Sequence, residues 1–263
     1  MLVNLHTHTK RCRHASGCDE DYVKAAISEG FTALGFSDHA PYIYPNGYVS
    51  TYKMTPDETG EYFSSLLDLR EKYKGKIDIY IGFETEYYPD LWERTLEFWR
   101  GFPLDYLILG QHFTSNEYNA TPELRSHASF RQGGNEKITR YVDLAIAAIK
   151  TEKITYIAHP DIIRAENYDL DHYRAEMRRL IASAKRADIP LEINLLGVRE
   201  ERHYPSECFF ELCGELSPKV VIGFDAHSPE AMTDMSAYKK ALEIVRKYSL
   251  DLVTDIKPKP VFL

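Results

Sequence analysis

The sequence lacks the features that mark several whole classes of protein. No apolar stretch approaches the ~20 residues that a membrane span requires, and no signal pattern precedes residues 2–5. Lys and Arg number 32 against 40 Asp and Glu, a formal net charge of −8, and they form no basic stripe that would bind a phosphate backbone. The cysteines are too few for a disulfide scaffold: Cys12, Cys18, Cys208 and Cys213. We therefore expect a reduced, cytoplasmic protein that binds neither membranes nor nucleic acid and acts on a small molecule.

The chain also lacks internal repeats, low-complexity tracts and Gly/Ser linkers, so we expect one domain over residues 1–263. Short apolar runs alternate with segments of helical spacing along its whole length. Seven of these runs are predicted to be strands: residues 2–5, 33–36, 77–83, 106–109, 154–158, 191–195 and 220–223.

One helix start is readable in detail. Thr55 followed by Pro56 and Glu58 has the pattern of an N-cap, a first-turn proline and a capping-box glutamate. Further helices are predicted over residues 19–29, 91–100, 136–150, 171–187, 206–216 and 236–248. This strand–helix alternation favours a parallel sheet with helical crossovers, and seven such units suggest an α/β barrel. Two long connections, residues 40–54 and 111–135, are predicted to be lids or binding loops.

Metal-type side chains follow most of the predicted strands. In chain order they are His6, His8 and His14 after the first strand, His39 after the second, Glu84 at the end of the third, His112 after the fourth, His159 after the fifth, and Asp225 and His227 after the seventh. All strand C-termini of a parallel barrel open onto one face, where active sites assemble. We therefore expect these nine side chains to converge.

The spacing within this set supports metal binding more than any single residue does. His6 and His8 lie two apart at a strand end, and Asp225 and His227 repeat that spacing. A single histidine is equally well explained as a satisfied polar residue at the core edge, and one HxH pair is weak. A purely structural zinc site needs four ligands and is usually rich in cysteine, whereas nine nitrogen and oxygen donors are too many for one ion.

The nine residues together resemble the motifs of the polymerase and histidinol phosphatase (PHP) superfamily. The resemblance implies a distorted, TIM-like (β/α)7 barrel with a trinuclear metal site at the C-terminal face of the strands. It implies that the first ion is held by His6, His8, Glu84 and Asp225, the second by Glu84, His112 and His159, and the third by His14, His39 and His227. These donors suit zinc, manganese or iron, and the sequence does not choose among the three metals.

Within that superfamily the chain most resembles the standalone histidinol-phosphate phosphatases. The resemblance rests on Gly35-Phe36-Ser37-Asp38-His39-Ala40-Pro41, His112-Phe113, His159-Pro160-Asp161-Ile162-Ile163-Arg164, and Glu192-Ile193-Asn194 leading to Gly197-Val198-Arg199. It implies that the enzyme is a phosphoric monoester hydrolase that converts L-histidinol phosphate to L-histidinol and phosphate, by attack of a hydroxide that bridges two ions. It also implies that Arg164 and Arg199 clamp the phosphate, although a solvated surface arginine is the plain alternative for each.

Several further roles stay open on the sequence. Candidates for the acid that protonates the leaving alkoxide are Asp161, ranked slightly first, Asp38 and a metal-bound water. The plain alternative for Asp161 is that it only supports a metal-bound histidine. For the substrate's amine and imidazole we expect Glu117 to meet the ammonium and the loop tyrosines to supply stacking surfaces, unless these residues only pack the lid: Tyr42, Tyr44, Tyr48 and Tyr52. Three histidines match no motif and are expected at the surface: His127, His172 and His203.

Some features depart from the pattern or compete with it. Asn4 stands where many members carry an acidic residue, which leaves the support of His6 or His8 in doubt. Cys12 and Cys18 lie close to His14, and we expect buried apolar roles for them more than metal ligation. The alternatives in function are a PHP-type enzyme that cleaves another monoester or a phosphodiester (a phosphotyrosine protein, a nucleotide) and a barrel that stores metal without catalysis. The oligomeric state is not readable from the sequence.

Overall fold

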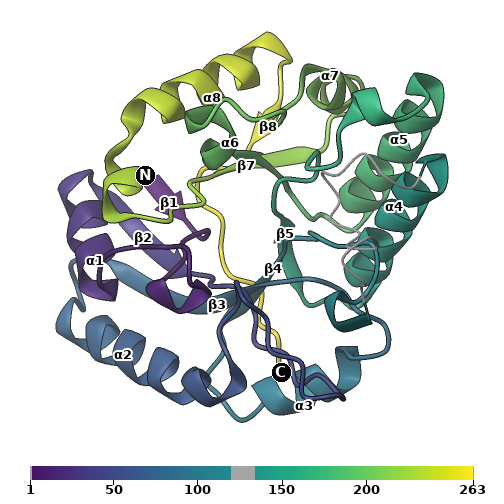
Figure 1. Ribbon diagram of the computed structural model, residues 1–263. Coiled ribbons are helices and arrows are strands. Elements are labelled where there is room, and N and C mark those ends of the chain that lie inside the picture. Colours follow the sequence, from purple (N-terminus) through teal and green to yellow (C-terminus); the bar gives the residue numbers. More distant parts are fainter. Residues whose placement is uncertain (1, 120–133, 263) are drawn as a thin grey trace.

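A single curled sheet of eight parallel strands forms the centre of the computed structural model, which describes residues 2–119 and 134–262 (Figure 1). The strands are hydrogen-bonded in chain order from β1 to β8, as expected when each is joined to the next by a crossover on the outside. Their bounds are β1 Leu2–Asn4, β2 Phe31–Phe36, β3 Asp78–Thr85, β4 Tyr106–Leu109, β5 Ile154–Ile157, β6 Leu191–Asn194, β7 Lys219–Gly223 and β8 Asp251–Leu252.

The helices surround this sheet on its outer face, as in a TIM-like barrel (Figure 1). Their bounds are α1 Asp19–Ser28, α2 Thr59–Lys72, α3 Trp92–Trp99, α4 Gly134–Lys150, α5 Leu170–Arg186, α6 Leu195–Arg199, α7 Glu207–Leu216 and α8 Met235–Lys247. The predicted capping box is present, because Glu58 Oε2 accepts from Thr55 N at 2.8 Å, and a short 3-10 turn, Pro56–Glu58, precedes α2. The sequence analysis missed α6, a single turn too short to show helical spacing.

The seven predicted strands are present, each ending within two residues of its expected bounds, and an eighth adds to them. Strand β8 has only two residues, so it is too short to show a periodic pattern in the sequence. It pairs with β7, while β1 meets β7 through an isolated bridge between Thr7 and Ala226, beyond the ends of both strands. His8 N donates to Ala226 O at 2.9 Å in that contact. The barrel is therefore drawn together at the C-terminal ends of its strands.

The core has an outer and an inner part. Most buried apolar side chains lie in one cluster that joins the sheet to the helices. A smaller cluster comes from alternate strand positions inside the barrel: Leu5, Tyr106, Ile108, Tyr156, Ala158 and Val221. The C-terminal segment crosses the opposite end of the barrel from the strand C-termini, where Lys259 N donates to Thr155 Oγ1 at 3.1 Å. One end of the barrel is thus plugged and the other remains open.

The two long connections differ in what can be said of them. Residues 40–54 form neither helix nor strand, and Tyr42 and Tyr44 of this loop are buried. Of the second connection, residues 120–133 lie outside the described residues, and His127 is among them. Within the part of the chain that the structure describes, no helix is long and apolar enough to cross a membrane.

Candidate metal centre

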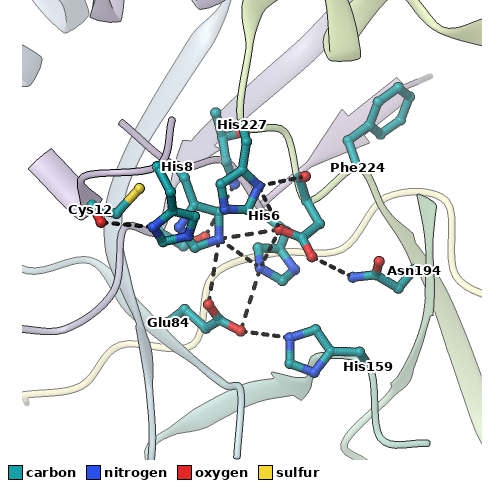
Figure 2. Close-up of polar contacts among 12 residues, drawn as sticks. His6, His8, Cys12, Glu84, His159, Asn194, Phe224 and His227 are labelled. Carbon is teal, nitrogen blue, oxygen red and sulfur yellow. Dashed lines mark hydrogen bonds and ion pairs between the residues drawn. The ribbon is translucent and has the colours of Figure 1, made fainter. Parts of the chain in front are cut away.

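All nine side chains of the predicted ligand set lie together at the open end of the barrel, each beyond or at the end of a strand. Figure 2 labels five of them: His6, His8, Glu84, His159 and His227. A second isolated bridge, between His39 and Glu84, sets two of them side by side on neighbouring strands. Within the described residues, five groups of three side chains present potential ligand atoms within 4.8 Å of one another, and every member but one belongs to the nine; the exception is Cys12.

Glu84 occupies the middle of the cluster. Its Oε1 lies 2.8 Å from His159 Nε2 and 3.6 Å from His112 Nε2. Its Oε2 lies 3.0 Å from His39 Nδ1 and 3.4 Å from His8 Nε2. Imidazoles therefore face both oxygens of this carboxylate, and the groups on either side of it could each hold a metal ion.

Asp225 is the second carboxylate of the cluster. Its Oδ1 lies 3.5 Å from His6 Nε2, 3.3 Å from His8 Nε2 and 3.4 Å from His227 Nδ1. The ring of His227 in turn stacks on that of His8, with centroids 4.1 Å apart. His227 also forms a group with His14 and His39, and His39 is shared with the group of His8 and Glu84.

Two of these residues hold a strained backbone. His159 has φ 29° and Asp225 has φ 46°, a left-handed conformation that costs a non-glycine residue of order 1–3 kcal/mol. Buried hydrogen bonds hold both in place: His159 N donates to Glu192 Oε2 at 2.9 Å, and Arg199 Nη2 donates to Asp225 O at 3.1 Å. Such strain is characteristic of functional sites, where surrounding contacts fix a side chain in an otherwise unfavourable place.

The electrostatics of the cluster favour a bound cation. Burial would raise the pKa of both Glu84 and Asp225, but the surrounding imidazoles hold each well below its usual range, so both are anions at neutral pH. Burial lowers the pKa of His227 to about 3 and leaves that ring neutral. At His6 burial also lowers the pKa, yet Asp225, Glu192 and Glu84 outweigh it and raise the value to about 10. The carboxylates therefore attract a positive charge into the cluster.

The donor set fits metal ions, because several of its buried polar atoms have no hydrogen-bond partner among the described residues. Four buried atoms of the nine residues lack a hydrogen-bond partner within the described chain: His8 Nδ1, His39 Nδ1, His159 Nδ1 and Asp225 Oδ1. A Cβ at Gly110 would lie 1.9 Å from Glu84 Oε1, and one at Gly223 would lie 1.7 Å from Glu192 Oε1. Glu84 and Glu192 therefore fit only because positions 110 and 223 carry glycine.

Glu192 supports the cluster from behind, a role that the sequence analysis did not assign. Its Oε1 lies 2.8 Å from His6 Nδ1, and its Oε2 accepts from Asn194 Nδ2 at 2.8 Å. Asn194 Nδ2 also lies 3.0 Å from Asp225 Oδ2. A carboxylate behind a ligating imidazole fixes the tautomer and orientation of the ring. The sequence signal was present, since Glu192 is an acidic residue inside a fully buried strand.

Asn4, the departure from the family pattern, joins two strand ends instead. Its Oδ1 accepts from His6 N at 3.1 Å and from Phe224 N at 3.0 Å, while its Nδ2 donates to Thr7 Oγ1 at 2.8 Å. The amide of Asn4 therefore fixes the backbone that carries His6. The carboxylate that contacts the imidazole of His6 comes from Glu192 instead of from position 4.

A cavity of about 680 Å³ opens above the cluster. Eight of the nine candidate ligands line it, and His6 lies beneath them, fully buried. The other lining residues are Thr51, Tyr52, Phe113, Ile162, Arg164, Leu196, Glu200, Arg202, His203 and Tyr204. The expectation that His203 is an ordinary surface residue is wrong, because its ring is half-buried against Ile162 O (Nε2···O 2.6 Å) and faces this cavity.

The two predicted phosphate-clamp arginines are placed differently. Arg164 is exposed on the cavity wall and makes no ion pair with a described carboxylate. Arg199 does not line the cavity; its Nη2 donates to Phe224 O at 2.8 Å and to Asp225 O, and its Nη1 is buried without a partner among the described residues. Arg202, which the sequence analysis did not select, lines the cavity but already pairs with Glu200 at 2.6 Å.

The two candidate acids, Asp161 and Asp38, are buried and lie outside the cavity lining. Asp161 Oδ2 accepts from Ser206 N, the N-cap residue of α7, and burial raises its pKa to about 6. Asp38 Oδ1 accepts from His39 N at 2.9 Å and faces His8 Nδ1 at 3.5 Å. The geometry brings Asp38 to a metal-type histidine rather than to the space that a substrate would fill.

Glu117 and Tyr42, the predicted substrate contacts, also lie away from the cavity lining. Glu117 is buried and pairs with Lys53 Nζ at 3.1 Å, and it accepts from the hydroxyl of Tyr52. Tyr42 directs its hydroxyl to the backbone of Glu86 at 2.7 Å. Of the four loop tyrosines proposed as stacking surfaces, Tyr52 alone lines the cavity among the described residues.

Similarity to known proteins agrees with this geometry. Residues 4–195, well over half of the chain, match the family model of the PHP domain. A protein of Deinococcus radiodurans named "Probable histidinol-phosphatase" is 26% identical over 231 residues, which cover 87% of each chain. A crystal structure from Listeria monocytogenes superposes with a TM-score of 0.71 at 21% identity, covering 90% of this chain and 99% of that one. A Lactococcus lactis histidinol phosphate phosphatase, complexed with zinc, L-histidinol and phosphate, gives a TM-score of 0.67 at 18% identity, covering 96% and 95%. Because the family model covers most of the barrel, this chain is a member of the PHP domain family.

Proposed function

We propose that this protein is a metal-dependent phosphomonoesterase that hydrolyses L-histidinol phosphate to L-histidinol and phosphate, and that it acts in the cytoplasm on this small molecule without a nucleic-acid or membrane partner. The observation that carries the proposal is a cluster of nine metal-type ligands at the base of a cavity that also presents an unpaired arginine. The names of the related proteins from Deinococcus radiodurans and Lactococcus lactis support the choice of substrate. The four cysteines are all unpaired, which suits a reducing compartment.

The site has donors for three divalent ions, of zinc, manganese or iron. The first set is His6, His8, Glu84 and Asp225, the second is Glu84, His112 and His159, and the third is His14, His39 and His227. Such ions neutralise phosphate oxygens and make a water molecule acidic enough to act as a nucleophile near neutral pH. The protein's part is to hold these donors rigidly, through Glu192 behind His6 and through the strained backbones of His159 and Asp225.

Arginine side chains are proposed to complete the phosphate site. Arg164 lines the cavity wall, and Arg199, which lies just outside the lining, holds its Nη1 without a partner among the described residues. A guanidinium group suits this role because it stays charged and donates two parallel hydrogen bonds to a phosphate group. Tyr52, Phe113 and Tyr204 give the mouth of the cavity aromatic surfaces for an imidazole ring.

Asp38 and Asp161 remain proposed as proton donors to the leaving alkoxide. Of the two, Asp161 has the pKa of about 6 that suits a general acid near neutral pH, but it would need a connecting water because it lies outside the cavity lining. Glu200 lines the cavity and is not a candidate metal ligand, so its carboxylate is free of that role. We therefore propose Glu200, rather than the buried Glu117, as the partner of the substrate's ammonium group.

A panel of phosphomonoesters tests the proposed substrate. We expect kcat/KM for histidinol phosphate to exceed the values for nucleotides and phosphotyrosine peptides by several orders of magnitude, because buried polar groups penalise substrates that leave them unpaired. Chelation should abolish turnover, and readdition of zinc, manganese or iron should restore it. Full turnover after verified metal removal would contradict the mechanism, whereas a preference for another monoester would change the substrate alone.

The two arginines give a matched pair of variants. We expect Arg164→Ala to raise KM and weaken competitive inhibition by inorganic phosphate, while metal content stays normal, because no ion pair joins its side chain to a candidate ligand among the described residues. Arg199→Ala should also lower the occupancy of the site that contains Asp225, since it removes the hydrogen bonds that hold the 224–225 backbone. Elemental analysis beside steady-state kinetics distinguishes the two. Equal metal loss in both variants would contradict this division of roles.

A further inference from the structure

A tenth metal-type donor lies beside the cluster, outside the nine-residue pattern. Cys12 is unpaired and fully buried at the edge of the histidines (Figure 2). Its sulfur forms a group with one nitrogen each of His8 and His227, in which the three atoms lie within 4.8 Å of one another. A buried cysteine normally packs among apolar side chains, as Cys213 does in the main core. The thiol of Cys12 instead faces imidazoles.

The local backbone is built to hold this thiol in place. Cys12 ends a 3-10 turn, Lys10–Cys12, in which Cys12 N donates to Thr9 O at 3.1 Å. Arg13 then adopts the left-handed conformation, with φ 73°, and reverses the chain. The turn brings His14 back so that its Nδ1 lies 2.7 Å from Cys12 O. Because a carbonyl only accepts, Nδ1 of His14 carries the proton and its Nε2 is left with the lone pair that a metal requires.

The contacts of His8 decide which candidate ion the thiol adjoins. Nε2 of His8 lies 3.3 Å from Asp225 Oδ1 and 3.4 Å from Glu84 Oε2, which places it in the first ligand set. Nδ1 of His8 faces Asp38 Oδ1 at 3.5 Å. A neutral imidazole offers one lone pair, so His8 cannot serve a second ion. The other imidazole in the Cys12 group is that of His227, which also belongs to the group of His14 and His39.

We infer that Cys12 binds, as a thiolate, the same ion as His14, His39 and His227, and so completes a site with three nitrogen donors and one sulfur donor. This inference rests on the metal centre proposed above. On binding, the S–H bond breaks, the proton passes to solvent, and the sulfur donates the retained electron pair to the ion. Four donors of this kind match the tetrahedral preference of zinc, and a thiolate disfavours manganese relative to zinc.

Cobalt(II) substitution tests the inference with a readout that does not depend on activity. We expect the fully loaded wild-type protein to show a near-ultraviolet sulfur-to-cobalt charge-transfer band, and Cys12→Ser to lose it. The triple variant Cys18→Ser, Cys208→Ser and Cys213→Ser keeps Cys12 as its only thiol and should retain the band in full. It provides the test even if Cys12→Ser fails to fold.

The possible outcomes separate this inference from the proposed metal centre. Cobalt that binds with the expected stoichiometry but without a charge-transfer band overturns ligation by Cys12 and leaves a thiol that only hydrogen-bonds the neighbouring imidazoles of His14 and His8. A protein that binds no cobalt overturns the metal centre itself. Affinity alone does not discriminate, since loss of an outer-shell partner also costs about 10–100-fold. A band that persists in Cys12→Ser and vanishes in the triple variant would assign the sulfur to another cysteine.

Discussion

Replacing Glu84 by glutamine is expected to abolish turnover and to remove bound metal. Glutamine has the same size as glutamate and fits beside Gly110, but it lacks the negative charge that faces His39 on one side and His159 on the other. A carboxylate between His159 and His39 is proposed to serve two ions, so its loss weakens two sites at once. The reduction in kcat/KM should therefore exceed the ~10–100-fold cost that is typical of removing an outer-shell partner.

Two matched variants make that expectation specific. Glu192→Gln alters the carboxylate behind His6, so a fall of about 10–100-fold in metal affinity is expected, without complete loss. Glu71→Gln alters an exposed carboxylate that pairs with Lys74 and should change neither metal content nor activity. Elemental analysis and kinetics on the three purified variants measure their metal content and turnover, and we expect both to be lowest in Glu84→Gln and highest in Glu71→Gln. If Glu84→Gln keeps full metal content and turnover, the central position of this carboxylate in the mechanism is wrong.

The second large effect is expected at Lys53, a fully buried lysine of the first long loop. Its ammonium lies 2.7 Å from Glu86 and 3.1 Å from Glu117, and four aromatic rings surround it: Tyr42, Tyr52, Tyr88 and Phe113. Burial opposes its charge, but the two carboxylates outweigh burial and raise the pKa of Lys53. The lysine thus joins the loop to the end of β3 and to the turn that carries Glu117.

Lys53→Met leaves two carboxylates buried without their cation. Breaking a buried ion pair on one side costs about 3–5 kcal/mol, which corresponds to a fall of roughly 6–20 °C in Tm for a chain of this size. Thermal unfolding of the chelator-treated protein measures this effect apart from metal binding. Lys74→Met, which removes an exposed lysine, should change Tm little. Adding Glu86→Gln and Glu117→Gln to Lys53→Met should restore part of the loss.

The difference in Tm between wild type and Lys53→Met should depend on pH, and the signs of the pKa shifts give its direction. Burial raises the pKa of Glu117, but Lys53 and the tyrosines lower it overall, so its contribution to stability is present above the ordinary carboxyl pKa and is lost as pH falls through the lowered value. The raised pKa of Lys53 means that its contribution is lost only as pH rises through that value. The gap in Tm between wild type and Lys53→Met should therefore be widest near neutral pH and narrow in acid. A gap that is constant down to acid pH would show that the ion pairs do not cause it.

Lys53 also bears on the metal centre. Glu86 Oε1 lies 3.3 Å from His112 Nδ1, so the buried lysine acts on a candidate ligand through one carboxylate. Glu86 is only 1% exposed, so it is a buried carboxylate rather than a solvated one. No sequence signal pointed to Lys53, because a lysine in a loop is normally solvated and only its tertiary neighbours bury it.

The sequence by itself determined the order of strands and helices, and it determined the candidate ligand set as far as residue type and position along the chain. Local periodicity gave the seven longer strands, and HxH spacing at strand ends marked His6, His8, Asp225 and His227. These signals are local, so they survive without knowledge of the fold. The two-residue strand β8 and the single turn of α6 escaped, because they are too short to carry a period.

Only the tertiary structure decided which side chains face the cavity and which lie behind its walls. Arg164 and Arg202 face it, whereas Arg199 turns to the backbone of residues 224 and 225. Glu117 looked like a solvent-facing partner for an amine, but it is buried against Lys53, from a loop more than sixty residues earlier. The physical reason is that burial and ion pairing depend on contacts between distant segments, whereas the identity of a residue at a strand end does not.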